Sequence, residues 1–477
     1  MRSEVKKWIK NPGLSHWEMG GLILFCSTII ALLIGLLGRG YILYGLFIFN
    51  GVLITGALAM RHPSFMVLGY LLSSIIYLNN YPGIPLPELL FFIYTVFIVL
   101  ALFLPDLLRF KIHFYSGLDK IALLFIILLA YGTVLGYLNG AKPVNLFGDL
   151  TYYAGFLTYF AFLKYFHRER FRKTLLVLLI GIIVYILVRN AINYQQIIIE
   201  AYALWQIQKA RAATNEVFIL AGSSFFLSAF LYVKSYLHKS FYLFLLLAGI
   251  GGIVITQSRG YWIALLFSFF IMFLIAEKSQ KKQILLVISV SLVAGILVIS
   301  IFFSDLFHII YDALLYRLSS IFDIFTERIG PSLRQRILET KKVMGKIIEN
   351  PIAGYGFGVT YSRFLTVPHI YKEVTYIHNG YLAIWFKLGL VGFITILYYC
   401  YLIFKYCLHI YRNTSRWAKP ISHSIIGILG GMLLVNVTSP QFFSFGSMFL
   451  MALMGIFASY YYNQYKYQLN KHTGISE

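Results

Sequence analysis

Three side chains stand out because their types and positions suit group-transfer chemistry. Arg259 lies in a short turn between two apolar segments, Arg334 lies at the start of an expected helix, and His378 directly precedes a long apolar segment. A histidine titrates near neutral pH and is suited to proton transfer. Arginine binds anionic oxygens through paired hydrogen bonds. The pattern therefore indicates proton transfer beside a bound anion.

Each of these side chains also has a structural interpretation. Arg259 is closely flanked by apolar residues and could extend its guanidinium group to phospholipid phosphates. Arg334 and Arg336 could be surface arginines beside lipid head groups. A single histidine is more often a hydrogen-bonded polar residue than a catalytic base. The elements that position these residues must decide between the two interpretations.

The composition indicates that lipid is the solvent for much of the chain. Hydrophobic residues make up 59% of the sequence and charged residues only 12%, against about 25% charged residues in soluble proteins. In a soluble protein the net charge of +22 would suggest nucleic acid. In an apolar chain it fits basic cytoplasmic loops instead, so we expect a lipid bilayer around the chain and no nucleic-acid partner.

Apolar segments long enough to cross a bilayer number about 14, within a range of about 12–14. They cover approximately residues 20–38, 41–60, 64–79, 88–105, 121–138, 148–165, 174–192, 215–233, 241–256, 261–276, 284–303, 379–404, 421–437 and 443–463. We therefore predict an all-α polytopic membrane protein. Its expected parts are an N-terminal bundle, the helices that flank the Arg259 turn, a large extracytoplasmic loop and C-terminal helices, at residues 1–240, 241–303, 304–378 and 379–477.

The distribution of basic residues sets the expected orientation. With a cytoplasmic N-terminus, every short inner loop carries lysine or arginine, whereas most short outer loops carry one basic residue or none. Lysine and arginine favour the cytoplasmic side of a membrane. Both termini should therefore be cytoplasmic, and Arg259, Arg334 and His378 should lie on the outer face of a bacterial inner membrane.

The loop at residues 304–378 is patterned as two amphipathic helices. The first covers residues 305–329. The second starts at Ser332, where Ser332 and Gln335 have the spacing of a capping box, and stops at Asn350. Its expected apolar face consists of Leu333, Ile337, Met344 and Ile348.

The loop and its junction with the next apolar segment add candidate binding residues. Free amides in the first turn of the second helix favour an anion beside Arg334. Alternate glycines in the segment 354–358 could present amides to phosphate or sugar, although a flexible turn is the favoured explanation. The candidate substrate-binding residues are Arg336, Gly356, Gly358, Asn379 and Tyr381. The outer acidic residues are scattered without an Asp-x-Asp motif, so we expect neither a metal nor another cofactor.

Two blocks of sequence carry a family resemblance. The first is Thr256–Gly260, followed by an aromatic residue and an apolar segment. The second comprises Ser332–Arg334, Glu349–Gly358, His378–Leu382 and Gly389–Gly392. In order and spacing, the blocks resemble the O-antigen polymerase/ligase superfamily of membrane glycosyltransferases, which includes Wzy-type polymerases and WaaL-type ligases. Leu338 and Lys387 depart from the family pattern, which often has an aromatic and an acidic residue at these positions. Lys387 inside an apolar segment has no explanation from the sequence.

The resemblance implies a GT-C-like fold and metal-independent transfer of an undecaprenyl-pyrophosphate-linked oligosaccharide to a hydroxyl acceptor. It implies that His378 is the base and that Arg259 and Arg334 bind the pyrophosphate. A flippase and a chain-length regulator are the protein partners that it implies. We prefer a polymerase of lipid-linked repeats over a ligase with a different acceptor. A lipid-linked-sugar transporter is less favoured, because transporters often show internal repeats and midplane charges and neither is evident here.

Overall fold

The computed structural model describes residues 63–74, 86–200, 215–302, 331–365, 370–414 and 417–473. The chain divides into two compact units, Met1–Ser73 and Ser74–Glu477. In the first unit, the described residues form one helix, α4 (Pro63–Ser73). The predicted segments 20–38 and 41–60, and the predicted surface helix at 305–329, lie outside the described residues. The candidate site is in the second unit.

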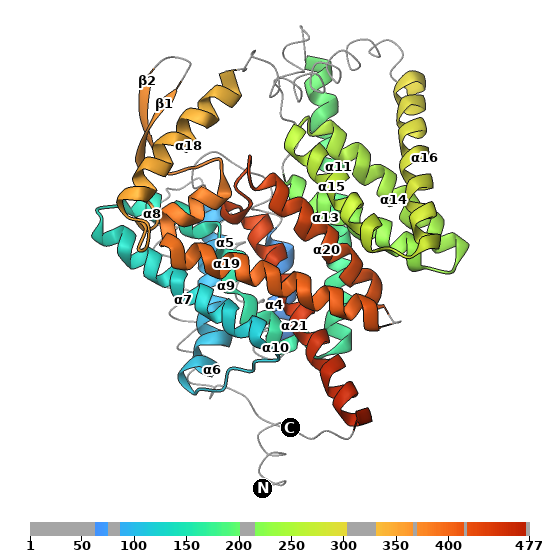
Figure 1. The fold of residues 1–477 in the computed structure, drawn as a ribbon, viewed down its shortest axis with the longest axis horizontal. Coiled ribbons are helices and arrows are strands. Elements are labelled where there is room, and N and C mark those ends of the chain that lie inside the picture. Colours follow the sequence, from blue (N-terminus) through green and yellow to red (C-terminus); the bar gives the residue numbers. More distant parts are fainter. Residues whose placement is uncertain are drawn as a thin grey trace, which may run out of the picture. The chain divides into compact units, whose positions relative to one another are not determined.

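The second unit is built almost entirely of helices (Figure 1). In chain order its described elements are α5 (Leu86–Ile98), η3 (Val99–Phe103), α6 (Leu104–Leu108), α7 (Gly117–Leu138), α8 (Pro143–Thr151), α9 (Ala154–Leu157), α10 (Tyr159–Phe166), α11 (Glu169–Glu200), α13 (Glu216–Tyr232), α14 (Tyr236–Ile255), α15 (Arg259–Ile275), α16 (Lys278–Phe302), α18 (Pro331–Glu349), β1 (Tyr361–Leu365), β2 (Ile370–Val374), α19 (Gly380–Asn413), α20 (Ala418–Val435), η5 (Gln441–Phe443) and α21 (Phe445–Thr473).

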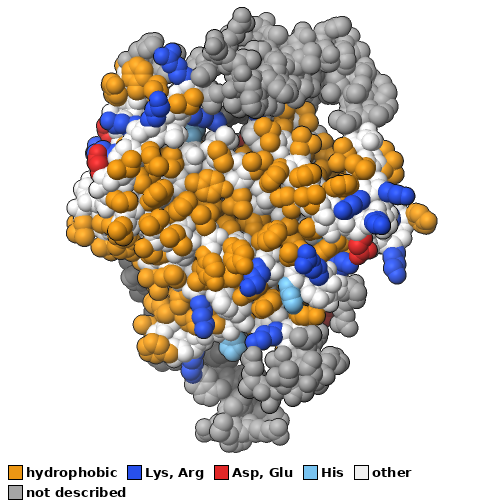
Figure 2. All heavy atoms as spheres, viewed as in Figure 1, with side chains coloured by type: hydrophobic (Ala, Val, Ile, Leu, Met, Phe, Trp, Pro, Cys, Tyr) orange, Lys and Arg blue, Asp and Glu red, His pale blue; other side chains and the backbone are white. Residues whose placement is uncertain are grey.

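The described helices confirm an all-α membrane protein. Seven of them are long and apolar enough to cross a membrane, and α13 and α15 are shorter apolar helices. Figure 2 shows hydrophobic side chains covering the middle of one face, with lysine and arginine toward its borders. The predicted number of about 14 spans stays a prediction, because the first two lie outside the described residues.

The predicted segment 148–165 is not one continuous helix but the three short helices α8, α9 and α10. Polar side chains explain the breaks, because the Thr151 and Thr158 hydroxyls donate to the carbonyl oxygens of Gly148 and Gly155, at 2.7 Å each. Such local bonds compete with the helical hydrogen-bond ladder. The average hydropathy of the segment does not reveal this competition.

Helix α18 runs from Pro331 to Glu349, close to the limits of the second predicted loop helix. On the predicted apolar face, Ile337, Met344 and Ile348 are exposed, so a different face packs on the protein. The buried residues are instead Glu339, Val343 and Ile347, which recur every four residues and pack toward α19 and β1.

The loop also contains a β-hairpin that the sequence analysis did not anticipate. Strands β1 and β2 pair in antiparallel fashion, with Arg363 opposite Lys372. The five residues of each strand do not alternate between apolar and polar side chains, so the usual strand signal is missing. The hairpin places Arg363 against α18, as described below.

Candidate active site

His378 is held by a carboxylate that comes from the loop helix. Its Nδ1 lies 2.8 Å from Oε2 of Glu339, and its backbone N–H donates to Oε1 of the same carboxylate at 2.6 Å. One carboxylate therefore fixes both the imidazole ring and the backbone at the entrance to α19. The Glu339 side chain is only 2% exposed, whereas the His378 side chain is 26% exposed.

Glu339 is also contacted by a residue of strand β1. Arg363 Nε from β1 lies 3.4 Å from Glu339 Oε2. Gln335, one turn before Glu339, accepts from Arg363 Nε at 3.0 Å with its amide oxygen turned toward the guanidinium group. Burial raises the pKa of Glu339, but hydrogen bonds and charge from His378, together with the charge of Arg363, outweigh it and hold this pKa below the usual value.

An ionised Glu339 fixes the proton on one nitrogen of His378. A carboxylate can only accept hydrogen bonds, so His378 Nδ1 carries the hydrogen in this contact. In a neutral imidazole, Nε2 then has a free lone pair and is the atom that can accept a proton. A carboxylate that orients an imidazole and stabilises its protonated form is the arrangement used by many histidine bases. The pair has the geometry of a base with its positioning residue.

The turn that carries Arg259 packs on the same connection as the start of α19. Arg259 is the first residue of α15 and is half-buried. Two residues later, the Tyr261 hydroxyl donates to Gln441 Oε1 at 2.9 Å. At the start of α19, the Gly380 N–H donates to the Asn436 carbonyl oxygen at 2.9 Å. Both contacts are with residues in the connection between α20 and α21. This connection therefore brings the two predicted site segments together.

The two arginines near the start of α18, Arg334 and Arg336, lie on different faces of the helix. Arg336 is three residues before Glu339 and therefore lies on nearly the same side of the helix. Arg334 is five residues before Glu339, which is about 140° around the helix axis. Arg334 is exposed and Arg336 is half-buried. The structure thus places Arg336 nearer to the face that holds His378.

Asn379 and Tyr381 have structural roles beside His378. The Asn379 side chain caps α19 by accepting from the backbone N–H groups of Tyr381 and Leu382, at 3.0 and 3.2 Å. The Tyr381 hydroxyl donates to the Leu433 carbonyl oxygen at 2.7 Å. These contacts anchor the helix start that carries His378. Whether either residue also binds substrate stays a prediction.

The glycine-rich segment 354–358 is inserted among the helices. The Gly356 N–H donates to the Lys387 carbonyl oxygen at 2.9 Å, and the Gly358 N–H donates to Asp149 Oδ2 at 2.6 Å. Both glycines have positive φ angles, and a Cβ at Gly356 would collide with the backbone of Gly136. The suggestion that these two amides face phosphate or sugar is therefore corrected, because the protein itself occupies them. The segment is a fixed turn.

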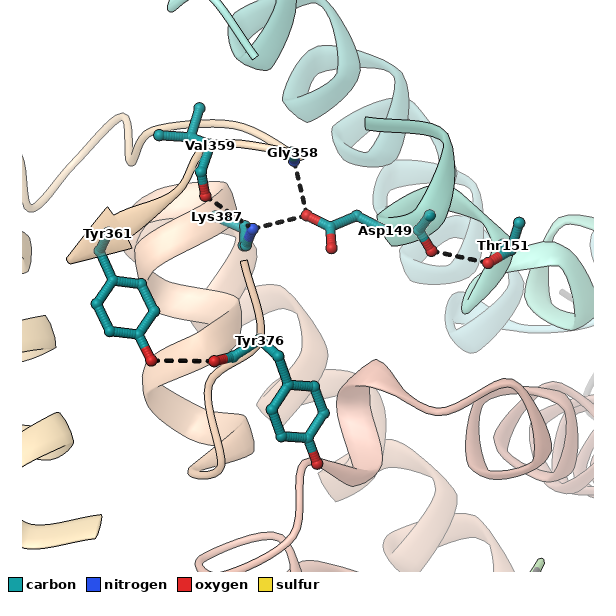
Figure 3. A network of polar contacts seen from close by, with 8 residues as sticks. Asp149, Thr151, Gly358, Val359, Tyr361, Tyr376 and Lys387 are labelled. Atoms are coloured by element: carbon teal, nitrogen blue, oxygen red, sulfur yellow. Dashed lines mark hydrogen bonds and ion pairs between the residues drawn. The ribbon is translucent and has the colours of Figure 1, made fainter. Parts of the chain in front are cut away.

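A buried ion pair explains Lys387. Its Nζ lies 2.6 Å from Asp149 Oδ2 and 3.3 Å from the Val359 carbonyl oxygen. Figure 3 shows Lys387 extending from its helix to Asp149, with Gly358 on the same carboxylate. The Lys387 and Asp149 side chains are 1% and 4% exposed. The pair joins α8, α19 and the glycine-rich segment.

The comparison with known protein families covers the segment that contains these elements. Residues 242–397 match a family model described as O-antigen ligase. The match supports the resemblance of these residues to the O-antigen polymerase/ligase superfamily. No curated protein matches the chain. The matched segment contains Arg259, Glu339, His378 and Lys387, whereas Asp149 lies outside it. Within these residues, the match supports glycosyl transfer of the O-antigen ligase or polymerase type.

The sequence analysis missed two residues of this candidate site, Glu339 and Arg363. Glu339 was one of many dispersed acidic residues, and Arg363 belongs to the unforeseen hairpin. The spacing of Gln335 and Glu339, four residues apart on one helix face, was the available signal. That signal could not identify the partner, because His378 follows 39 residues later and reaches Glu339 only through the tertiary fold.

Proposed function

We propose that the chain polymerises undecaprenyl-pyrophosphate-linked oligosaccharide repeats on the outer face of the bacterial inner membrane. The observation that carries the proposal is the contact between His378 and Glu339. It leaves a partly exposed imidazole within the segment that matches the glycosyl-transfer family. Both termini would be cytoplasmic and the site extracytoplasmic, as the positive-inside pattern predicts.

The transfer step uses the residues as follows. His378 Nε2 takes the proton from an acceptor sugar hydroxyl while the acceptor oxygen bonds to the anomeric carbon of the donor glycan. The bond between that carbon and the pyrophosphate oxygen breaks, and the leaving undecaprenyl pyrophosphate keeps the electron pair. Glu339 holds the imidazole and stabilises its protonated form. The proton on His378 then passes to solvent.

The leaving group gains negative charge and requires positive charge beside it. Arg259, at the first turn of α15, supplies one guanidinium group. Arg334, in the first turn of α18, and Arg336, in the second, supply two more near a helix N-terminus, where free amides and the helix dipole also favour an anion. No metal is needed for this charge balance, which accords with the expected metal-independent transfer.

A ligase that moves the glycan to a different acceptor is the second candidate. The description of the matching family, O-antigen ligase, favours it. The two reactions share the donor, the base and the leaving group, and they differ only in the molecule that supplies the hydroxyl. A flippase that delivers the donor and a chain-length regulator are the protein partners we propose for the polymerase.

The test uses the full chain in lipid nanodiscs with an undecaprenyl-pyrophosphate oligosaccharide and EDTA. Products are separated by gel and weighed by mass spectrometry, beside His378→Ala and Arg259→Ala. We expect a ladder at multiples of one repeat, lost in both variants. Transfer only to an added second acceptor would establish the ligase. No transfer from folded protein with any glycan acceptor would refute both candidates.

A further inference from the structure

A buried polar connection contacts both segments that carry the proposed site. It joins α20 to α21 and comprises residues 436–444. On the side of α19, Asn436 is fully buried, and its carbonyl oxygen accepts from the Gly380 N–H at 2.9 Å. A Cβ at Gly380 would collide with the Asn436 side chain. Helix α19 therefore begins in direct contact with the connection, two residues after His378.

The same connection holds the start of α15, which follows the Arg259 turn. Gln441 is buried and accepts from the Tyr261 hydroxyl at 2.9 Å. A Cβ at Gly260 would lie 3.1 Å from the Thr438 hydroxyl oxygen, so a side chain there would require movement of the connection. The two residues that directly follow Arg259 are thus both packed on the connection.

Gln441 uses all of its hydrogen-bonding capacity. Its Oε1 accepts from the Ser447 hydroxyl at 2.6 Å in addition to the bond from Tyr261. Its Nε2 donates to the Ser439 carbonyl oxygen at 3.2 Å and to the Ser439 hydroxyl oxygen at 3.3 Å. A side-chain amide offers two acceptor positions and two donor hydrogens. The amide is therefore fixed in one orientation, and it holds the Tyr261 hydroxyl at one point.

The turn before α15 is held in one conformation as well. Gln257 has a φ of +50°, which is costly for a residue with a side chain. The Thr256 hydroxyl donates to the Ile253 carbonyl oxygen at 2.7 Å and accepts from the Ser258 N–H at 3.1 Å. A strained backbone persists only where the surrounding contacts determine it. The turn that carries Arg259 is thus defined by contacts on both of its sides.

We propose that the hydrogen bond between Tyr261 and Gln441 positions Arg259 for binding of the pyrophosphate leaving group. The proposal rests on the proposed function of Arg259. Tyr261 is two residues after Arg259, which is about 200° around the helix axis. A fixed Tyr261 hydroxyl therefore sets the rotation of the first turn of α15 and with it the direction in which Arg259 leaves the helix. Hydrogen bonds between helices are directional, whereas apolar packing is not.

The two residues of this bond come from different parts of the chain. Tyr261 belongs to the matched segment, residues 242–397, whereas Gln441 lies outside it. Helices α15 and α20 pack side by side (Figure 1), and the connection after α20 carries Gln441. Both residues are positioning residues, because they act through Arg259 and not on the substrate. The C-terminal helices would thereby fix the Arg259 turn relative to the start of α19.

The test measures binding of farnesyl pyrophosphate, a short prenyl pyrophosphate, to the full chain in lipid nanodiscs with EDTA. Isothermal titration calorimetry gives the dissociation constant, with empty nanodiscs as the blank. The assay needs neither glycan nor acceptor, so it applies to a polymerase and to a ligase. The variants are Tyr261→Phe, Gln441→Leu, Arg259→Gln and Arg259→Gln/Tyr261→Phe. The matched control is Ser268→Ala, which removes a buried hydroxyl of the same helix, 2.8 Å from Ser224 Oγ of α13.

We expect Arg259→Gln to raise the dissociation constant about tenfold to a hundredfold, from a lost hydrogen bond to a charged group. Tyr261→Phe and Gln441→Leu should each raise it about threefold to tenfold, from a lost neutral hydrogen bond. The double variant should stay within about twofold of Arg259→Gln, because no guanidinium group remains to be misplaced, whereas independent effects would multiply. Ser268→Ala should bind as wild type does.

Tyr261→Phe removes one hydroxyl and keeps the buried ring, so it remains informative even if Gln441→Leu does not fold. An unchanged constant in Tyr261→Phe, multiplied effects in the double variant, or an equal rise in Ser268→Ala would overturn the positioning role and leave the proposed function standing. An unchanged constant in Arg259→Gln, or no binding by the folded wild type, would refute pyrophosphate binding by Arg259 and the positioning role with it.

Discussion

Two buried carboxylates hold residues of the segment that matches the family, and their partners differ in contact with solvent. The Glu339 carboxylate holds a histidine that is 26% exposed, whereas Asp149 holds a lysine that is 1% exposed. The distances are similar, at 2.8 and 2.6 Å. Only the first pair leaves a reactive atom that a substrate can reach. Similar ion-pair distances thus accompany a proposed catalytic role in one place and a structural role in the other.

Loss of one partner of the buried pair should have the largest effect on stability. Lys387→Met leaves Asp149 buried without its cation, and such a change costs about 3–5 kcal/mol. Asp149→Asn/Lys387→Met should recover most of this loss, because the asparagine oxygen can still accept from the Gly358 N–H. Equilibrium unfolding in mixed micelles measures both variants. Similar losses in the single and double variants would show that the charges are not coupled.

Glu339→Gln should reduce transfer while leaving the fold in place. A hydrogen bond to a charged group contributes about 1.5–3 kcal/mol, so the turnover rate should fall roughly tenfold to a hundredfold. Steady-state rates of the folded variant measure the effect. An unchanged turnover rate would show that Glu339 does not position His378 for transfer.

The depressed pKa of Glu339 predicts that acid loosens the hairpin. A carboxyl whose pKa is lower in the folded than in the unfolded state contributes stability above its unfolded pKa and loses it as pH falls through its folded pKa. Protection of β1 and β2 from hydrogen exchange, corrected for intrinsic rates, should therefore fall below about pH 4.5, the ordinary value for glutamate. Glu339→Gln should lack this pH dependence. The same dependence in the variant would assign the transition to another group.

Substitution of the arginines of α18 should have the smallest effect on transfer. It should also indicate where the lipid-linked donor binds. Arg336 shares the helix face of Glu339, whereas Arg334 is exposed on another face. We expect Arg336→Gln to raise the KM for the lipid-linked donor by roughly tenfold, from one lost charge-assisted hydrogen bond. Arg334→Gln should raise it less. The reverse order would place the pyrophosphate nearer the start of the helix.

Local patterns in the sequence predicted the features that depend on residues close together in the chain. The limits of α18 were predicted to within one residue from Ser332 and Asn350, and the start of α19 was predicted from the apolar segment after His378. The hydrophobic composition predicted a membrane protein. The buried face of α18 could not be predicted, because it contains Glu339 and an apolar stripe lies on another side.

Contacts between distant segments lay beyond sequence reasoning. Asp149 and Lys387 are 238 residues apart, and neither alone indicates its partner. The break of the predicted segment 148–165 depends on hydrogen bonds from Thr151 and Thr158 to the carbonyl oxygens three residues earlier. The hairpin that supplies Arg363 consists of strands without apolar/polar alternation. Each feature is stabilised by packing that forms only when the chain folds.

The most direct test compares the two pairs in one assay. Single-turnover transfer from a labelled undecaprenyl-pyrophosphate oligosaccharide is measured for the folded fraction of wild type, His378→Ala and Asp149→Asn/Lys387→Met. General-base catalysis contributes about 10²–10⁴-fold, so His378→Ala should lose at least about a hundredfold while the double variant stays within a few-fold of wild type. Wild-type transfer by folded His378→Ala, or a greater loss in the double variant, would contradict the assignment of chemistry to the exposed pair.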